Sequence, residues 1–250
     1  MIEIVIGFVI ALAVGLTGVG AGSVTAPILM LFLRLPAPAA VGTALIFGAA
    51  IKFVAAPSYV WRKQVDFRVL SWMLAGGLPG AIAGSLLLDR LKGTEHSNWL
   101  YGALGIMIAA SAAINLWRSF SRTAVRGSND RRRWLPLITL PIGAEVGFSS
   151  AGSGALGSLA LMGLTSLTAA QVVGTDVFYG LGVSLVGGGF HFGAGNYDAA
   201  VLGRLIVGGI AGVLIGANLS ATLPSRPLRV AISVWLVSVG AQLLWRGLGN

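Results

Sequence analysis

The sequence predicts an all-α polytopic membrane protein made of two inverted-topology repeats. Each repeat is expected to hold one broken or re-entrant helical hairpin and three transmembrane helices. Three observations support this fold class. The mean hydropathy is +0.86. Only 10% of the 250 residues are charged, against about 25% in soluble domains. A glycine-rich motif also recurs later in the chain, in a constant register.

The first expected element is a hairpin around GLTGVGAGSVTAP, residues 15–27. The apolar stretches on either side, 2–14 and 24–35, are short. A helix over 2–14 would cover about 20 Å at 1.5 Å per residue, whereas the hydrocarbon core of a bilayer is about 30 Å thick. We therefore expect a re-entrant hairpin. Two thin, tilted crossings are the alternative.

Longer apolar segments follow at 40–61, 69–88 and 99–117, and each is long enough to span a bilayer. The next segment, RSFSRTAVRGSNDRRRW, carries six arginines and one acidic residue. Positive charge marks cytoplasmic loops, so this segment is expected inside. The chain thus divides into a first transmembrane repeat at 1–117, a basic cytoplasmic connecting loop at 118–134 and a second transmembrane repeat at 135–250.

The second repeat parses like the first, with GFSSAGSGALGSL at 147–159 in place of the first glycine-rich motif. Short pieces at 135–147 and 156–165 precede long ones at 169–192, 199–221 and 228–246. An offset of 132 residues aligns Val41-Gly42-Thr43 with Val173-Gly174-Thr175, Asp66 with Asp198, and Gly76, Gly77, Gly80 and Gly84 with Gly208, Gly209, Gly212 and Gly216. Three crossings per repeat is an odd number, so the repeats are expected to be inverted, with both termini outside.

Two smaller features of the repeat predict local structure. Asp66 and Asp198 each precede a long helix and are interpreted as N-caps. Glycines at four-residue spacing allow close helix packing in membranes. This packing could serve the core of one chain or a homodimer contact.

The candidate site is formed by the two glycine-rich motifs, residues 15–27 and 147–159, where each short helix pair is interrupted. We call these motifs the first and second breaks. Irregular backbone at membrane depth is tolerated where protein buries it or water reaches it. The half-helix after each break offers free N–H groups and a positive dipole end, which suit a small anion. The alternative is that the glycines and hydroxyls only shape a turn. The candidate substrate-binding residues are Thr17, Gly20, Gly22, Ser23, Thr43, Lys52, Ser149, Ser150, Gly152, Ser153, Gly154 and Thr175.

Four ionisable residues fall in apolar stretches, where a charge is costly and indicates function by default. Lys52 is expected near mid-bilayer, either to attract the anion or to pair with Asp176. Asp176, Glu145 and His191 are candidates for proton coupling. Asp176 could instead balance Lys52, Glu145 could face a cytoplasmic vestibule, and His191 could be an interfacial residue.

Composition also excludes several classes. Without cysteine and with two histidines, the chain has no disulfide or thiolate metal site, and we expect neither an enzyme, a metal nor a cofactor. The net charge of +9 is attributed to cytoplasmic loop anchors and not to nucleic-acid binding. The expected partners are a small anion, protons and the lipid bilayer.

Several strings resemble the sulfite exporter TauE/SafE family. In the first half these are GLTGVGAGSVTAPIL, the VGTALIF segment that ends at Lys52, QVDFR and GGLPGAIAGSLL; in the second half they are GFSSAGSGALGSLAL and QVVGTDVFYG. The resemblance covers nearly the whole chain. It implies export of sulfite or another small sulfur oxyanion or organosulfonate across the bacterial cytoplasmic membrane, coupled to the proton gradient. A passive anion channel and an importer of a related anion remain alternatives.

Overall fold

The computed structural model describes residues 1–17, 21–92, 97–120, 131–219 and 225–248, and these residues are almost entirely helical. The predicted apolar segments agree with the helices to within a few residues at most ends. The elements are α1 (Ile2–Thr17), α2 (Ala21–Leu31), α3 (Ala37–Trp61), α4 (Phe67–Leu91), α5 (Ser97–Phe120), a 3-10 turn η1 (Arg132–Trp134), α6 (Leu135–Ser149), α7 (Leu156–Leu164), α8 (Ala169–Gly193), α9 (Ala199–Leu219) and α10 (Ser225–Leu248).

Within the described residues, six helices are long and apolar enough to cross a membrane: α3, α4, α5, α8, α9 and α10. This confirms the prediction of a multi-pass helical membrane protein. The helices flanking the two breaks are shorter, with 16 and 11 residues in α1 and α2 and 15 and 9 in α6 and α7. The longest of these covers only about 24 Å, less than the roughly 30 Å of a hydrocarbon core.

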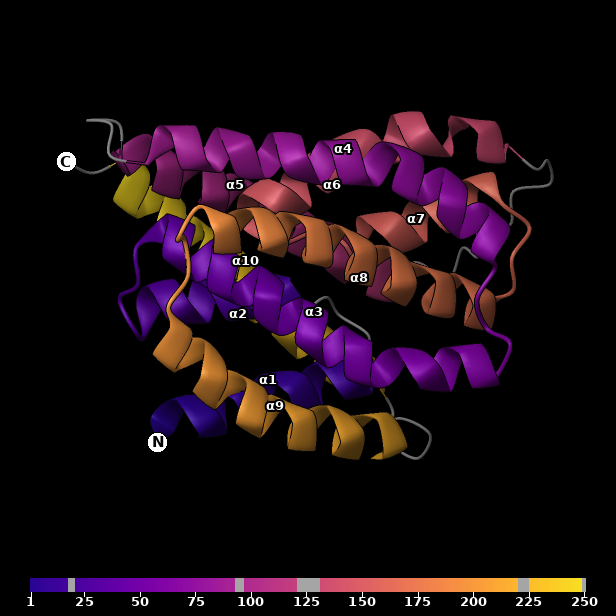
Figure 1. Cartoon of the computed structure of the whole chain (residues 1–250), viewed down its shortest axis with the longest axis horizontal. Coiled ribbons are helices and arrows are strands. Elements are labelled where there is room, and N and C mark those ends of the chain that lie inside the picture. Colours follow the sequence, from indigo (N-terminus) through magenta and orange to yellow (C-terminus); the bar gives the residue numbers. More distant parts are fainter. Residues whose placement is uncertain (18–20, 93–96, 121–130, 220–224, 249–250) are drawn as a thin grey trace.

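The helices pack in pairs around a central pair (Figure 1). α3 and α8 lie against each other across the middle of the molecule, α4 runs along α6, α1 runs along α9, and α5 packs on α10. In each half, the helix before the break therefore packs on a long helix of the other half. α1 begins and α10 ends toward the same end of the molecule, at the left of the view.

The two central helices are antiparallel. Near the start of α3, the Thr43 hydroxyl accepts a hydrogen bond of 3.0 Å from the backbone N–H of Asp198, just beyond the end of α8. Near the start of α8, the Thr175 hydroxyl accepts one of 3.0 Å from the backbone N–H of Asp66, just beyond the end of α3. Residues 132 apart thus make the same contact with the partners exchanged.

The glycine rows repeat this exchange. A Cβ on Gly80 of α4 would collide with the carbonyl oxygen of Leu140 on α6, and one on Gly212 of α9 would collide with that of Phe8 on α1. Leu140 and Phe8 are themselves 132 residues apart. Both rows therefore serve close helix packing inside the chain, as expected for a membrane protein that brings helix backbones into contact through small residues.

Both predicted N-caps are confirmed. The Asp66 carboxylate accepts hydrogen bonds of 3.0 Å from the backbone N–H groups of Arg68 and Val69. The Asp198 carboxylate accepts one of 2.9 Å from the backbone N–H of Val201. Each satisfies orphan donors in the first turn of the helix that follows, and so fixes where α4 and α9 begin.

We expect Gly80→Ala to destabilise the protein by about 1–3 kcal/mol, because the added methyl overlaps backbone that cannot move without separating α4 from α6. Gly203→Ala is the matched control, since no atom lies within 4 Å of a Cβ built at that position in α9. Thermal unfolding in detergent measures both. Equal melting temperatures for the two variants would contradict the close packing of α4 on α6.

Candidate functional site

The two breaks contact each other in the interior. Ser150 ends α6 in the left-handed backbone region at φ +60°, and its hydroxyl donates a hydrogen bond of 2.9 Å to the carbonyl oxygen of Gly22, in the first turn of α2. Gly22 has no room for a Cβ because the Ser150 backbone lies against it. A serine in this strained region is held there by the opposing break.

α6, the second break and α7 form a hairpin whose two ends lie next to each other. The backbone N–H of Arg131, before α6, donates a hydrogen bond of 2.9 Å to the carbonyl oxygen of Leu164, the last residue of α7. Gly152 turns the chain between the two helices at φ +91°, a conformation that glycine adopts without strain. α6 and α7 therefore enter and leave at the same end of the molecule.

Lys52 extends from α3 to the second break. Its side chain is only 8% exposed. The ammonium donates hydrogen bonds to the hydroxyls of Ser153, in the break, and Ser184, on α8, at 3.3 and 3.4 Å. A Cβ on Gly180 would lie 2.5 Å from the Lys52 Nζ, so the glycine leaves the space that the ammonium fills. A buried cation is thus held by two hydroxyls, both of which retain acceptor and donor capacity.

Asp176 lies on α8 beside the first turn of α7. The Ser158 hydroxyl donates a hydrogen bond of 2.7 Å to its carboxylate, and Gly157 packs directly against the same carboxylate. A negative charge at the start of a helix is favoured by the helix dipole. The N-terminus of α7, which the sequence offered as an anion site, thus already faces a carboxylate of the chain itself.

Lys52 and Asp176 line one small cavity of about 50 Å³, together with Ser153 and Gly154 of the second break and Gly15 near the end of α1. A water molecule needs about 10–15 Å³ of such space. The cavity therefore has room for a few waters or one small polyatomic anion. Its wall combines one cation, one carboxylate and the hydroxyls of Ser153 and Tyr59 with apolar side chains.

Other candidate residues lie outside this cavity lining. Thr43 and Thr175 are fully buried and bind loop backbone, as described above. The Ser149 hydroxyl donates to the carbonyl oxygen of Glu145 at 2.9 Å, inside α6. Ser23 is buried in the first turn of α2. Gly20 falls outside the described residues, and the same holds for the side chain of Thr17, the last residue of α1.

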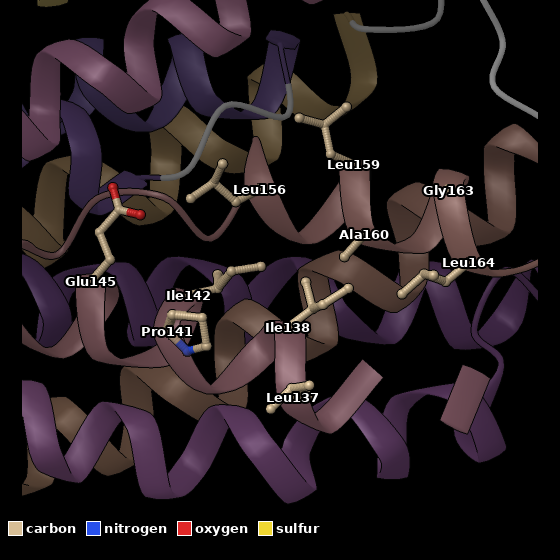
Figure 2. A pocket seen from close by; sticks show the side chains of 10 residues that line it. All are labelled: Leu137, Ile138, Pro141, Ile142, Glu145, Leu156, Leu159, Ala160, Gly163 and Leu164. Atoms are coloured by element: carbon tan, nitrogen blue, oxygen red, sulfur yellow. The ribbon is translucent and has the colours of Figure 1, made fainter. Parts of the chain in front are cut away.

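Glu145 faces a different space, shown in Figure 2. It lies at one end of an apolar groove of about 630 Å³ between α6 and α7, whose other lining residues include Ile138, Pro141, Leu156 and Leu159. Its carboxylate packs against Gly152 in the break, where a Cβ would lie 2.9 Å from the carboxyl carbon. Glu145 is therefore close to the second break but is absent from the lining of the Lys52 cavity.

His191 is fully buried, at 0% exposure, and does not lie at a lipid interface. Its Nε2 lies 3.2 Å from the carbonyl oxygen of Gly147, near the end of α6. Its Nδ1 lies 3.4 Å from the side-chain nitrogen of Asn196, which also donates to Asp89 at 2.8 Å. A carbonyl only accepts, so the ring donates through Nε2 to the second break.

Two residues of the site were not predicted, Ser184 and Tyr59. Ser184 is the counterpart of Lys52 at the 132-residue offset, so the register of the repeat already held a signal for it. Tyr59 lines the cavity near the end of α3 and is the counterpart of His191 in the same register. Aligned positions that hold different polar residues in the two repeats can therefore indicate site residues, as identical ones do.

The fold and the site define a polytopic helical membrane protein with a charged cavity beside two opposed chain breaks. The family model for the sulfite exporter TauE/SafE matches residues 3–243. The chain belongs to this family, and is therefore a membrane transporter.

Curated relatives agree with this assignment. The chain is 28% identical over 250 residues to the probable membrane transporter protein YjnA of Bacillus subtilis (strain 168), covering 96% of this chain and 98% of the relative. It is 24% identical over 249 residues to the probable membrane transporter protein YdhB of the same organism, covering 98% and 100%. No solved structure gives a significant match.

Proposed function

We propose that this protein exports a small sulfur oxyanion or organosulfonate across the cytoplasmic membrane. It does so by alternating access between two halves of inverted topology, with both termini outside. The observation that carries the proposal is the Lys52 ammonium, buried in a cavity of anion size that is lined by residues of both breaks. A buried charge in a membrane-spanning helix is costly, so its presence indicates a function by default.

The donors around the cavity suit an oxyanion. Lys52 offers a charge-assisted hydrogen bond, which is stronger than a neutral one, and the Ser153 hydroxyl can rotate to donate to a bound oxygen. The apolar remainder of the lining lowers the local dielectric constant and so strengthens these contacts. An anion that left alone would move down the electrical gradient of a cell with a negative interior, by about 2.3 kcal/mol per charge per 100 mV, and a proton that leaves with it cancels one such charge.

Asp176 is the proposed carrier of the coupling proton. When ionised, it offsets the Lys52 charge and repels an anion across the shared cavity. When protonated, it leaves the ammonium free to bind. Proton and anion binding are then coupled, and each raises the affinity for the other by the same factor. Glu145 and His191 remain alternative carriers, since both lie against the second break.

The proposed inversion is supported by the antiparallel central helices and the exchanged contacts of residues 132 apart. Arg68 and Ala200 test it, because they are equivalent in the repeat and both are exposed at the start of a long helix. The chain has no cysteine, so Arg68→Cys and Ala200→Cys each carry a single thiol. A membrane-impermeant maleimide is expected to label Arg68→Cys only from the cytoplasmic side and Ala200→Cys only from the outside. Labelling of both from one side would rule out the inversion.

The substrate class is tested by a binding screen on purified protein. Sulfite and methanesulfonate are expected to raise the melting temperature saturably, while chloride and acetate at equal ionic strength do not. A ligand at 100 times its Kd stabilises the folded state by about 2.7 kcal/mol. This is a large fraction of the free energy of unfolding of a typical protein, about 5–15 kcal/mol. Equal effects of all four anions would refute the proposed specificity.

A passive channel would use the same cavity, so a second measurement separates it from a carrier. In proteoliposomes loaded with unlabelled anion, a carrier exchanges labelled for unlabelled substrate, and the rate saturates with concentration. A linear rate that is indifferent to anion on the far side would identify a channel instead.

A further inference from the structure

Among the residues that the structure describes, the repeat-related equivalents of the Lys52 cavity lining are all buried. Each residue that lines it has an equivalent 132 positions away. At the mouth of the cavity, Tyr59 and Ala55 of α3 are only partly buried and Ala217 of α9 is exposed. Their equivalents, His191, Gly187 and Ser85, are all buried, as are the equivalents of every other lining residue.

This asymmetry has a direction. Lys52, Ala55 and Tyr59 follow one another toward the end of α3, which leads into the basic segment 62–68 that we propose is cytoplasmic because of its charge. The closed equivalent space lies at the other end, where α8 leads into the loop containing Asn196. The structure is therefore open on the cytoplasmic side of the breaks and closed on the outer side.

In the buried equivalent of the cavity, two side chains donate hydrogen bonds to one carbonyl oxygen. Gly147 is among the last residues of α6, whose carbonyl groups have no partner within the helix. His191 Nε2 and the Ser85 hydroxyl each donate to its oxygen at 3.2 Å. Asn196 contacts the Nδ1 side of the His191 ring. The Asn196 side chain is itself held by hydrogen bonds to Asp89 at 2.8 Å and from Lys92 at 3.1 Å.

The equivalent carbonyl on the cytoplasmic side is that of Gly15, near the end of α1. Ala217 occupies the position of Ser85 and has no side-chain donor. Tyr59 occupies the position of His191, and both Tyr59 and Gly15 line the open cavity. Like the histidine, tyrosine presents a single donor at the far end of a planar ring.

We propose that His191 and Tyr59 are the two gating residues of the transport cycle, with His191 closing the outer side by its bond to Gly147. In the outward-facing state, His191 leaves Gly147 and the Tyr59 hydroxyl closes the cytoplasmic side by donating to the Gly15 carbonyl oxygen. The exchange satisfies one helix-end carbonyl in each state, as a two-state element requires. It rests on the proposed alternating access, but not on the identity of the anion.

Two single-cysteine variants report the two sides, Ala55→Cys inside the open cavity and Ala44→Cys in the closed space, at the position equivalent to Asp176. The probe is a small membrane-impermeant methanethiosulfonate, applied without any transported anion to right-side-out and inside-out vesicles. We expect Ala55→Cys to react from the cytoplasmic side and Ala44→Cys to be protected. Reaction of Ala55→Cys from the outer side only would overturn the assignment of Tyr59 to the cytoplasmic gate.

In the Ala44→Cys background, His191→Ala is expected to raise the outer labelling rate on the order of tenfold, because a lost buried hydrogen bond shifts the population by about that factor. Adding Tyr59→Phe should lower the rate again, because it weakens the outward-facing state. Phe192→Ala and Val60→Ala are the matched controls, since they adjoin the two gates, are exposed and are also 132 residues apart. Neither control should change labelling.

If His191→Ala does not fold, Ser85→Ala removes the second donor to Gly147 and should raise outer labelling severalfold in the same direction. Labelling of Ala44→Cys that is unchanged in the folded His191 or Ser85 variant, or raised equally by Phe192→Ala, overturns the proposal. Because no anion is present, that failure would leave the anion screen of the proposed function intact. Loss of anion binding with the expected labelling pattern would refute the substrate class and not the gates.

Discussion

Lys52→Met is expected to weaken binding of a sulfur oxyanion by at least about 100-fold, or about 3 kcal/mol. The substitution keeps the length and apolar stem of the side chain but removes the ammonium that Ser153 and Ser184 hold in the cavity. The anion would then enter a buried space without a compensating charge. Isothermal titration of the purified variant measures the change, and thermal unfolding shows whether the fold survives.

Lys63→Met is the matched control, since it makes the same change at an exposed lysine in the loop after α3. It should alter the affinity by about twofold at most, because surface charges are strongly screened. Wild-type affinity in a folded Lys52→Met protein would show that Lys52 does not bind the anion and has a structural role instead.

A second variant separates the position of the charge from its presence. Gly180→Ala keeps Lys52, but its methyl group would lie 2.5 Å from the ammonium and so displace it from Ser153. We expect a loss of affinity on the order of tenfold. Gly48→Ala is the repeat-related control, because the nearest atom to its Cβ would be an ordinary 3.7 Å away. Equal affinities in the two variants would mean that the exact place of the ammonium does not matter.

The features that sequence predicted well depend on local properties. Apolar length locates the helices, and Asp66 and Asp198 cap the helices that directly follow them. Because the halves are related by one register, each assignment in the first half supports the same assignment in the second. The sequence also singles out Lys52 as a charge in the middle of an apolar segment, and the structure buries its side chain within the protein.

The features that sequence missed depend on contacts between the halves. Thr43 and Thr175 are polar residues of α3 and α8, the long helices that follow the breaks, but their hydroxyls bind backbone from the opposite half. The half-helix N-terminus of α7 is a general anion site, yet Asp176 reaches it from another helix. A repeat also predicts equal halves. Only the structure reveals that Tyr59 is partly exposed beside the cavity while its equivalent, His191, is fully buried.

Asp176→Asn is expected to remove the pH dependence of anion binding. In the wild type, an ionised Asp176 offsets Lys52 across the cavity, so affinity should fall as pH rises, by up to about tenfold per pH unit. The asparagine keeps the shape of the side chain and can still accept a hydrogen bond from the Ser158 hydroxyl, but it does not gain or lose a proton in this pH range. The variant should bind at neutral pH as tightly as the wild type does in acid. Titration with methanesulfonate measures this, because the charge of that anion does not change over the range.

Asp66→Asn is the control, since asparagine also caps helices and Asp66 lies at the N-terminus of α4; its pH profile should match the wild type. If Asp176→Asn retained the wild-type profile, Asp176 would not carry the proton. The same titration on Glu145→Gln and His191→Gln would then separate the remaining two candidates, because only loss of the actual carrier flattens the curve. A flat wild-type profile would instead mean that anion movement follows the membrane potential without a coupled proton.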